Sequence, residues 1–319
     1  MVTVHLIRNT KRKMYKPKIL KLRPHFEYRV WAGDEIKTFF NLKEDKIGEA
    51  WVISAFENKS AKVSENQTLL EFYQDKNNAY FFNSYNLKNE YPLLAKIIDA
   101  KADLSVQIHP DDQYAKQFNS LGKTECWYIL DTKKDNDIVF GHKAKTVDQF
   151  KSMVEHKQWN DLLVNKPIDK DDFIYVPSKK IHAIKADTLI YELQQSSDIT
   201  YRVYDYDRLD HGKKRELHLD HVYQLVDCPD VDLTKEQISN KPNYLVANNL
   251  FNLVKVENEG NNVYKFDDAQ WIQLTVIKNH GTINGLQANL YDSFIVSHNE
   301  PIVIDGELTC LTSYVTDRK

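Results

Sequence analysis

Cysteine is scarce in this sequence and never occurs in closely spaced pairs. The 319 residues contain only three cysteines, Cys126, Cys228 and Cys310, which lie far apart. An odd number of distant cysteines does not fit a disulfide framework, and without a C-x-x-C pair no thiolate zinc motif is indicated. A metal site in this chain would therefore use nitrogen and oxygen ligands.

The sequence also lacks a large net charge and a long apolar run. Lys and Arg number 43 against 46 Asp and Glu, so the formal net charge is −3. This balance favours neither a nucleic acid nor a membrane surface as partner. No segment approaches the roughly 18 apolar residues of a membrane span, and residues 1–20 contain no continuous apolar signal region. We expect a cytoplasmic protein.

Glycine is sparse as well, with nine residues where average usage of about 7% predicts roughly twice as many. Strand-forming residues are abundant instead, including 18 Tyr and 14 Phe. Short segments rich in them recur between turn residues without alternating helices, which predicts a mainly β sandwich or barrel. The predicted strands are 26–31, 49–56, 93–100, 104–110, 125–131, 137–142, 172–177, 188–195 and 199–206.

Helical periodicity occurs in only two segments, residues 68–82 and 146–165. In the second, Thr146 is suited to cap the helix start. We interpret both as excursions beside a β core. Residues 226–245 contain two prolines and few apolar residues, which indicates a linker. The chain is therefore divided into residues 1–225, with a helical insertion around 146–165, and a strand-rich region at 226–319.

Polar side chains interrupt the apolar strand at 104–110. Gln107 and His109 are two residues apart, so they project from the same face of a strand. Lys123 and Glu125 repeat this spacing at the start of a later strand, and His182 follows another. If these strands line one barrel, Gln107, His109, Glu125 and His182 can converge on zinc or a neighbouring divalent metal.

Two other groups of polar residues have simpler explanations. His211, His218 and His221 lie beside Lys213, Lys214 and Arg215, whose positive charges disfavour a divalent ion. We predict an exposed helix start there. Asp111 and Asp112 follow Pro110 and are typical of the first turn of a helix.

Three cationic side chains lie close to the predicted metal ligands in the sequence: Lys96, Lys123 and Arg202. An inward-facing Arg in a barrel is costly unless it is paired. Arg202 is therefore either half of a structural pair with Glu192, Asp198 or Asp205, or a residue that binds an anion. Together the three cations would suit an anionic substrate or a developing oxyanion.

Several long motifs resemble the short bacterial form of the mannose-6-phosphate isomerase family. They are GEAWVISAF (48–56), PLLAKIIDAKADLSVQIHPDDQYA (92–115), LGKTECWYILD (121–131), GHKAKT (141–146), VPSKKIHAI (176–184) and YELQQSSDITYRVYDYDR (191–208). The resemblance is dense over about residues 20–225. It implies a cupin fold of two jelly-roll barrels, in which the second, at 226–319, is degenerate and holds no metal.

The same resemblance implies an activity and roles for individual residues. The family interconverts mannose 6-phosphate and fructose 6-phosphate through an enediol and depends on one zinc ion. Its metal ligands match Gln107, His109, Glu125 and His182, and its catalytic arginine matches Arg202. Lys123 matches an active-site lysine, while Ser105 and Lys96 match positions associated with the substrate phosphate. Lys123, a hydroxide on the metal and Asp205 all remain open as the group that removes the proton.

The sequence departs from the family pattern at two turns. Lys179 stands where the family usually has a glycine before the second histidine. If that turn needs a positive φ, a lysine costs about 1 kcal/mol or more, and the turn could take another conformation that moves His182. Near the N-terminus the family's Trp-Gly-Gly is Trp31-Ala32-Gly33.

Other functions remain open at this point. One is an isomerase of another aldose phosphate, such as glucose 6-phosphate. Another is a non-catalytic cupin that binds a sugar phosphate. His109, Glu125 and His182 also fit the two-His-one-carboxylate pattern of non-haem iron oxygenases, although a Gln ligand argues against it. We expect a small sugar phosphate as partner, and a homodimer is possible.

Overall fold

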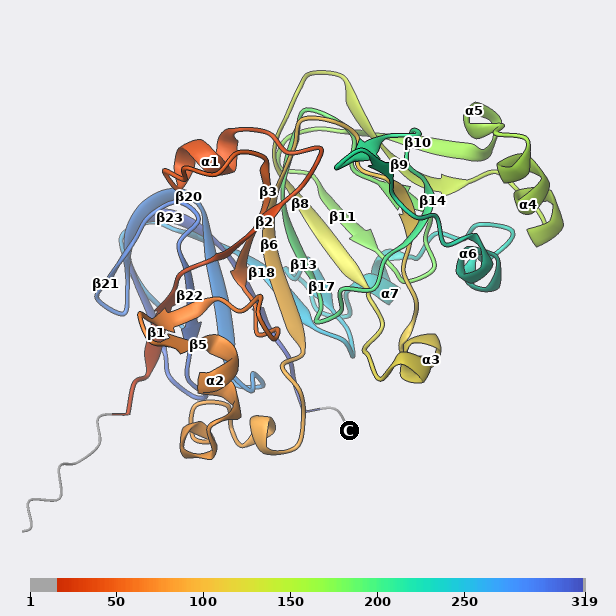
Figure 1. The fold of residues 1–319 in the computed structure, drawn as a ribbon. Helices are drawn as coiled ribbons and strands as arrows, with labels where there is room; N and C mark the ends of the chain where they lie inside the picture. Colours follow the sequence, from red (N-terminus) through yellow and green to blue (C-terminus); the bar gives the residue numbers. More distant parts are fainter. Residues whose placement is uncertain (1–15, 318–319) are drawn as a thin grey trace, which may run out of the picture.

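The computed structural model describes residues 16–317, and most of its regular structure is antiparallel sheet (Figure 1). The mainly β architecture expected from the sequence is confirmed. Among these residues, every pairing between named strands is antiparallel. No helix within the described range is long and apolar enough to cross a membrane.

Two sheets build the part of the molecule that holds the candidate site. The first has the order β11 (Phe173–Val176), β8 (Glu125–Thr132), β13 (Thr188–Gln195), β6 (Leu93–Ala100), β3 (Ile47–Ile53) and β2 (His25–Tyr28). The second has the order β10 (Leu163–Ile168), β9 (Asn136–His142), β12 (His182–Ala183), β7 (Val106–Ile108) and β14 (Tyr201–Tyr204). A shared apolar core lies between them, in which Trp127, Ile129 and Ile190 of the first sheet meet Ile138 and Ile168 of the second.

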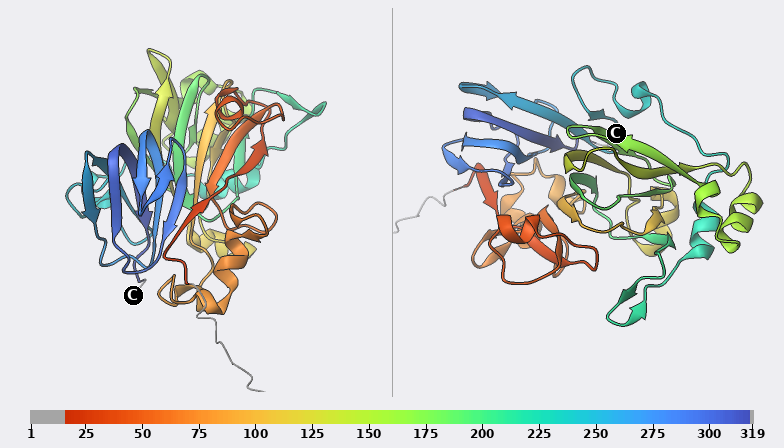
Figure 2. Two further views of the ribbon diagram at one scale, coloured as in Figure 1. Left: turned by 90° about the vertical axis from the view of Figure 1, so that its left-hand side faces the viewer. Right: turned by 90° about the horizontal axis from the view of Figure 1, so that it is seen from above.

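A third sheet of eight strands contains the C-terminal region (Figure 2, blue). Its order is β1 (Ile19–Leu22), β22 (Ser293–Val296), β20 (Ile272–Ile283), β23 (Ile302–Tyr314), β18 (Asn252–Asn258) and β17 (Val246–Ala247), with β19 (Asn261–Tyr264) on β23 and β21 (Leu286–Ala288) on β20. The sheet has its own apolar core, which includes Leu274, Phe294 and Ile304. The division at residues 225 and 226 stays a prediction, and β1 is a strand from the first range that pairs with the second.

Both faces of the six-stranded sheet are buried. One face packs in an apolar core and the other carries polar side chains, so apolar and polar residues alternate in part of strand β13. Tyr191 and Leu193 of β13 pack in a core that also contains Leu253 and Leu311 of the eight-stranded sheet. The residues between them, including Glu192, face the other way. Glu192 thus points into the space between the six-stranded and five-stranded sheets.

Short helices and hairpins complete the fold. The helices are α1 (Glu35–Phe39), α2 (Leu69–Gln74), α3 (Asp112–Ala115), α4 (Val147–Glu155), α5 (Trp159–Leu162), α6 (Leu219–Leu225) and α7 (Lys235–Ile238), with 3₁₀ turns η1 (Lys76–Asn78), η2 (Tyr85–Leu87) and η3 (Lys116–Phe118). The hairpins are β4 (Lys62–Ser64) with β5 (Gln67–Thr68), and β15 (Leu209–Asp210) with β16 (Lys213–Lys214). Helices α4, α5 and α6 lie together and pack against one face of the five-stranded sheet (Figure 1).

The predicted helices are present but shorter than expected. Thr146 caps α4, as predicted, but the chain turns at Lys157 with φ 55° and resumes as α5. Residues 163–168 are then strand β10 rather than helix, and Pro167 is tolerated there because β10 is an edge strand. The predicted linker at 226–245 is irregular apart from α7.

Candidate active site

The six-stranded sheet contributes a row of polar side chains to the interior of the first barrel. Glu192 on β13 lies opposite Lys96 on β6 and opposite Trp127 on β8. Gln194, two residues on, lies opposite Glu125. Because side chains alternate along a strand, these residues share one face. The period-two pattern therefore places Lys96, Glu125 and Glu192 on the same wall.

The five-stranded sheet supplies a second row. Gln107 on β7 lies opposite His182 on β12 and opposite Arg202 on β14. Its neighbours Val106 and Ile108 point outward into a separate apolar core with α4 and α6. Gln107, His182 and Arg202 consequently form a line across three strands.

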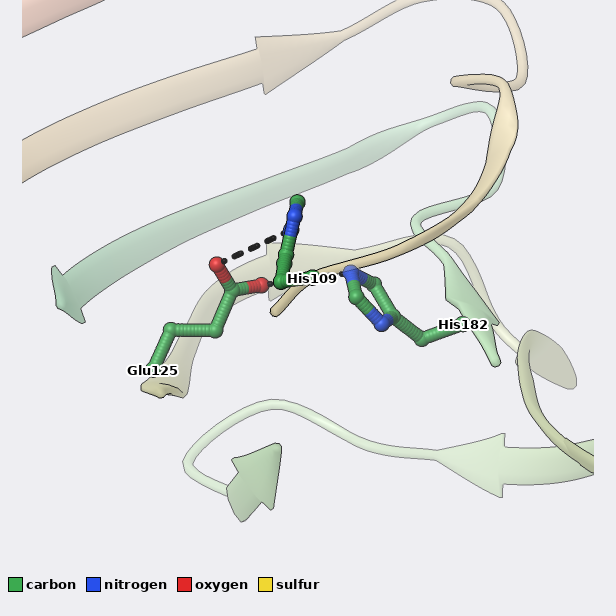
Figure 3. Close-up of side chains that lie close together, drawn as sticks. All are labelled: His109, Glu125 and His182. Atoms are coloured by element: carbon green, nitrogen blue, oxygen red, sulfur yellow. Dashed lines mark ion pairs between the residues drawn. The ribbon is translucent and has the colours of Figure 1, made fainter. Parts of the chain in front are cut away.

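His109, Glu125 and His182 converge between the two sheets (Figure 3). His109 Nε2 lies 3.4 Å from Glu125 Oε2, and His182 Nε2 lies 3.4 Å from Glu125 Oε1. All three residues are buried, with at most 1% of their surface exposed. This is the one group of three or more potential metal-ligating side chains found within residues 16–317.

Both imidazoles are oriented for metal binding by backbone carbonyl groups. His109 Nδ1 donates to the carbonyl of Ile199 at 3.1 Å, and His182 Nδ1 donates to the carbonyl of Lys180 at 2.9 Å. With the proton on Nδ1, each Nε2 presents its lone pair to Glu125. Glu125 Oε2 is buried and makes no hydrogen bond to a described residue. A divalent cation would satisfy all three atoms, so the residues present fit the metal that the sequence predicts.

The electrostatics of the triad also suit a metal. Burial, together with the positive charge of Lys123, keeps the pKa of His109 well below its usual value, and burial lowers the pKa of His182 to about 4. Both are therefore neutral near pH 7, as metal ligation requires. Burial and the nearby Glu192 raise the pKa of Glu125 to about 7, against the pull of Lys123 and Lys96. A bound cation would offset that cost.

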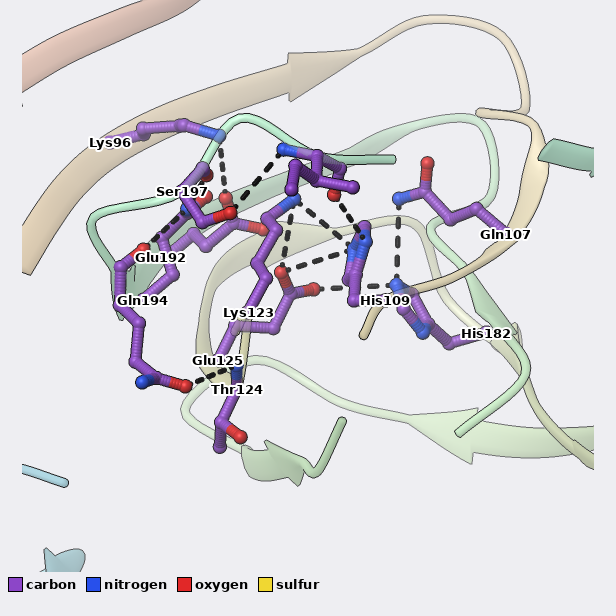
Figure 4. Close-up of polar contacts among 12 residues, drawn as sticks. Lys96, Gln107, His109, Lys123, Thr124, Glu125, His182, Glu192, Gln194 and Ser197 are labelled. Carbon is purple, nitrogen blue, oxygen red and sulfur yellow. Dashed lines mark hydrogen bonds and ion pairs between the residues drawn. The ribbon is translucent and has the colours of Figure 1, made fainter. Parts of the chain in front are cut away.

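Gln107 and Lys123 lie next to the triad (Figure 4). The amide nitrogen of Gln107 is 3.4 Å from His182 Nε2, and a half-turn of the amide would present its oxygen there instead. Lys123 Nζ lies 3.1 Å from His109 Nε2 and 3.3 Å from Glu125 Oε2. All four residues predicted as metal ligands are thus brought together, with Lys123 beside them.

The turn before His182 keeps the conformation that the family glycine would provide. Lys179 has φ 68°, its N–H donates to the carbonyl of His109 at 2.8 Å, and its Nζ lies 2.9 Å from Asp111. Lys179 thus adopts the left-handed backbone conformation despite its strain, and His182 reaches the site. Asp111 also caps α3 through the N–H of Tyr114, so the predicted helix start is confirmed.

The second departure, Ala32 for glycine, is also accommodated. Ala32 forms a bridge with Ala100, and it is Gly33 that has no room for a side chain, because a Cβ there would collide with the carboxylate of Asp99. Of the two glycines in the family's Trp-Gly-Gly, packing therefore requires only the second, which is Gly33 here.

Buried carboxylates pair with cationic side chains near the triad. Lys96 Nζ donates to Glu192 Oε1 at 2.9 Å (Figure 4). The indole N–H of Trp127 lies 3.1 Å from both Glu125 Oε1 and Glu192 Oε2. Further out, Arg29 makes two hydrogen bonds to Glu49, at 2.8 and 2.9 Å. The sequence analysis placed Lys96 near the site but missed these pairings, because opposite neighbours in the sheet depend on strand order.

A cavity of about 370 Å³ lies beside the triad, where Gln107 and Lys123 line it and contact His182 and His109. Its lining includes every residue that the sequence predicts for the substrate: Lys96, Ser105, Lys123 and Arg202, together with Gln107. Among the lining residues that the sequence analysis did not assign to a site are Arg29, Glu49, Arg215 and His218.

Arg202 is not half of a structural ion pair. None of Glu192, Asp198 and Asp205 pairs with it: Glu192 holds Lys96, Asp198 holds Lys59, and Asp205 holds Arg208 and Arg215. Burial and the neighbouring Arg215 lower the pKa of Arg202 from its usual value. Of the two alternatives for Arg202, the structure thus favours the anion-binding one.

The prediction of an exposed helix start at the histidine cluster was partly wrong. His218 does precede α6, but it is only half-exposed, and its Nδ1 accepts the backbone N–H of Arg202 at 3.1 Å. His221 stacks on Tyr201 with ring centroids 4.3 Å apart. The sequence could not reveal this, because the contact depends on how α6 returns to β14.

Known proteins are similar to this chain in sequence. A family model described as the catalytic domain of type I phosphomannose isomerase matches residues 19–158. The probable mannose-6-phosphate isomerase GmuF of Bacillus subtilis is 40% identical over 318 residues, which cover 92% of this chain and 98% of that protein.

Solved structures agree with the sequence comparisons. A mannose 6-phosphate isomerase from Bacillus subtilis is similar with a TM-score of 0.86 and 31% identity, over 94% of this chain and all of that one. A putative mannosephosphate isomerase from Archaeoglobus fulgidus shares the fold, with a TM-score of 0.77 and 16% identity over 95% of this chain and 99% of that one. The sheets and these similarities confirm the cupin fold, and the chain belongs to the mannose-6-phosphate isomerase family of metal-dependent aldose–ketose isomerases.

Proposed function

We propose that the protein is a zinc-dependent isomerase that interconverts mannose 6-phosphate and fructose 6-phosphate through an enediol. The observation that carries this proposal is the buried His109–Glu125–His182 triad beside a cavity lined by cations, in a chain of this family. Two nitrogens and a carboxylate, without a thiolate, suit zinc among the divalent metals. The same family and composition support a cytoplasmic enzyme, and a homodimer remains a proposal.

Four residues would hold the metal: Gln107, His109, Glu125 and His182. A divalent ion bound there would stabilise negative charge on the substrate oxygens as the proton next to the carbonyl is removed. The carbonyl groups of Ile199 and Lys180 orient the two imidazoles for this task. Ser105 and Lys96 would contact the substrate from the wall of the cavity, with the charge of Lys96 largely offset by Glu192.

Arg202 and Lys123 would act on the reacting atoms. Arg202 lines the cavity with no acidic partner among the described residues, so its charge is available to the oxyanion that develops on the substrate. Lys123 lies beside the triad and reaches the same space. Asp205 is a poor candidate for the proton-transfer group: burial is outweighed by Arg215 and Arg208, which hold its pKa below the usual range, and it does not line the cavity.

A coupled assay of mannose 6-phosphate isomerisation tests the proposal. The protein is assayed after treatment with a chelator and again after addition of zinc, with bound metal measured in parallel. We expect activity to disappear with the chelator and to return with zinc. Zinc-replete protein without isomerase activity would refute the proposed function, and oxygen-dependent turnover would point to an oxygenase instead.

A further inference from the structure

The segment that follows α6 is anchored to the strands around a proposed metal ligand. Val226 packs in the same apolar core as Ile181, the residue that precedes His182. His142 of β9 donates from Nε2 to the backbone carbonyl of Asp227 at 3.0 Å. The beginning of the linker predicted from the sequence is therefore fixed against β9 and β12.

The side chain of Lys180 binds the next part of this segment. Its Nζ donates to Asp230 Oδ2 at 2.8 Å, to Asp232 Oδ1 at 2.6 Å and to the carbonyl of Val231 at 3.3 Å. Lys180 is only 3% exposed, so these three oxygens satisfy the three donors of a buried ammonium group. We call residues 227–232 the docked linker.

The glycine at position 141 leaves the space that this contact needs. A Cβ on Gly141 would lie 2.2 Å from Asp230 Oδ2 and 3.5 Å from Lys180 Nζ, so the ion pair occupies the place of a side chain. The N–H of Gly141 also donates to the carbonyl of Ile181 at 2.7 Å, which joins β9 to the residue between Lys180 and His182. The docked linker, β9 and the residues before His182 thus form one packed unit.

Lys180 also contacts the proposed metal ligand, through its backbone. The carbonyl of Lys180 accepts the Nδ1–H of His182 at 2.9 Å, and this bond directs the Nε2 lone pair at Glu125. The ammonium group of the same lysine is held by the docked linker. A shift of the linker would therefore move the backbone of Lys180 and, with its carbonyl, turn the imidazole of His182.

We propose that Lys180 positions His182 for zinc, and that zinc binding is thereby coupled to the docking of residues 227–232. Lys180 is a positioning residue, because it acts through His182. The inference rests on the metal site of the proposed function. Since coupling between two sites is reciprocal, the docked linker strengthens zinc binding, and bound zinc in turn holds the linker in place.

Substitution of Lys180 by Met removes the ammonium group and keeps most of the side-chain volume. We expect the zinc affinity, measured by competition with a chelator, to fall about tenfold or more, the loss typical of a residue that supports a ligand. Lys185→Met is the matched control, because Lys185 lies three residues after His182 and pairs with Asp137 of β9 at 2.5 Å. Its zinc affinity should stay near that of the wild type.

Variants on the linker side separate positioning from a general loss of stability. Asp230→Asn weakens the same contact, so it should lower zinc affinity too. The double variant should bind zinc no more weakly than Lys180→Met alone, because both changes act through one contact. Lys180→Arg keeps the charge and should restore most of the affinity. Additive losses in the double variant would overturn the proposal. If Lys180→Met does not fold, Asp230→Asn is compared with Asp137→Asn instead.

Hydrogen exchange in the docked linker measures the reciprocal effect. Peptides that cover residues 227–232 are followed by mass spectrometry with and without zinc. We expect zinc to slow exchange there in the wild type and in Lys185→Met, and to have little effect in Lys180→Met. Exchange that zinc leaves unchanged in the wild type would overturn the coupling. Equal zinc affinity in Lys180→Met and Lys185→Met would overturn the positioning role.

Zinc binding and hydrogen exchange need no turnover, so the two proposals can fail separately. If zinc binds and slows exchange in the docked linker but mannose 6-phosphate is not isomerised, only the proposed reaction fails. If the wild type isomerises with zinc and Lys180→Met binds zinc as tightly as the control, only the role of Lys180 fails.

Discussion

The carboxylates of Glu125 and Glu192 share one donor, the indole N–H of Trp127, which lies 3.1 Å from an oxygen of each. Glu125 is a proposed metal ligand, and Glu192 holds Lys96. Trp127 is fully buried between the two sheets. One side chain therefore links the metal site to the cationic wall of the cavity.

Replacement of Trp127 by Phe should weaken metal binding. The ring would still fill the core, but Glu125 would lose the donor that orients it. Loss of such a supporting bond typically costs about 10–100-fold in metal affinity. Competition for zinc with a chelator measures the effect. Trp51→Phe is the control, because the indole of Trp51 binds Glu49 at 2.7 Å in an equally buried position away from the triad. Equal zinc affinity in the two variants would contradict the prediction.

Substitution of His182 and of Arg202 by Ala should have separable effects. His182→Ala removes a proposed ligand, so we expect zinc to be lost along with activity. Arg202→Ala removes a charge that acts on the substrate, so kcat should fall by about two to three orders of magnitude with near wild-type zinc. Metal analysis beside steady-state kinetics checks both. Full zinc occupancy in His182→Ala would refute its ligand role, and zinc loss in Arg202→Ala would make Arg202 structural.

Glu49 should make stability depend on pH in the acid range. Its burial opposes ionisation, but Lys96 and Arg29 outweigh it and lower the pKa of Glu49 to about 2. A carboxyl with a lowered pKa in the folded state stabilises the fold above its unfolded pKa, near 4.5. That stabilisation, about 3 kcal/mol, is lost as the pH falls from about 4.5 to about 2.

Urea unfolding of wild-type protein and Glu49→Gln at a series of pH values measures this contribution. We expect the difference in free energy of unfolding to be largest above about pH 5 and to shrink toward pH 2. A difference that stays constant over this range would show that Glu49 is not the group responsible.

Lys179 allows backbone strain to be separated from an ion pair. Lys179→Ala keeps a left-handed non-glycine residue and loses the pair with Asp111, while Lys179→Gly loses the pair but relieves the strain. We expect the glycine variant to be more stable than the alanine variant by about 1 kcal/mol. Thermal or urea unfolding of both checks the order. An alanine variant as stable as the glycine variant would mean that the turn relaxes when the lysine is removed.

The sequence predicted which residues meet at the triad because their arrangement follows from strand periodicity. Gln107 and His109 are two positions apart, and so are Lys123 and Glu125, which places each pair on one side of its strand. His182, after another predicted strand, and Arg202 were also singled out from the residues, and the family motifs then matched their roles. The central strands were found for the same reason, and β6 has the predicted bounds.

Residues that depend on tertiary packing were not predictable in this way. Trp127 contacts Glu192 only because β8 and β13 are neighbours in the sheet. Arg215 and His218 enter the cavity because a hairpin and α6 bring residues 209–225 back to β14. In the sequence they belong to a polar segment rich in lysine and histidine, for which the sequence predicted only an exposed helix start. The turn at Lys157 that shortens the predicted helix likewise left no signal in the pattern of apolar residues.

The pairing of β1 with β22 has a consequence for how the protein folds. Ile19 lies opposite Val296, so the first described strand finds its partner almost at the other end of the chain. Contacts between such distant segments form late and slow folding. During synthesis on the ribosome β1 must wait until nearly all of the chain has emerged, and its unpaired edge is exposed to other chains meanwhile. Premature termination before β22 would leave that edge permanently uncovered, even with every residue of the metal site already made.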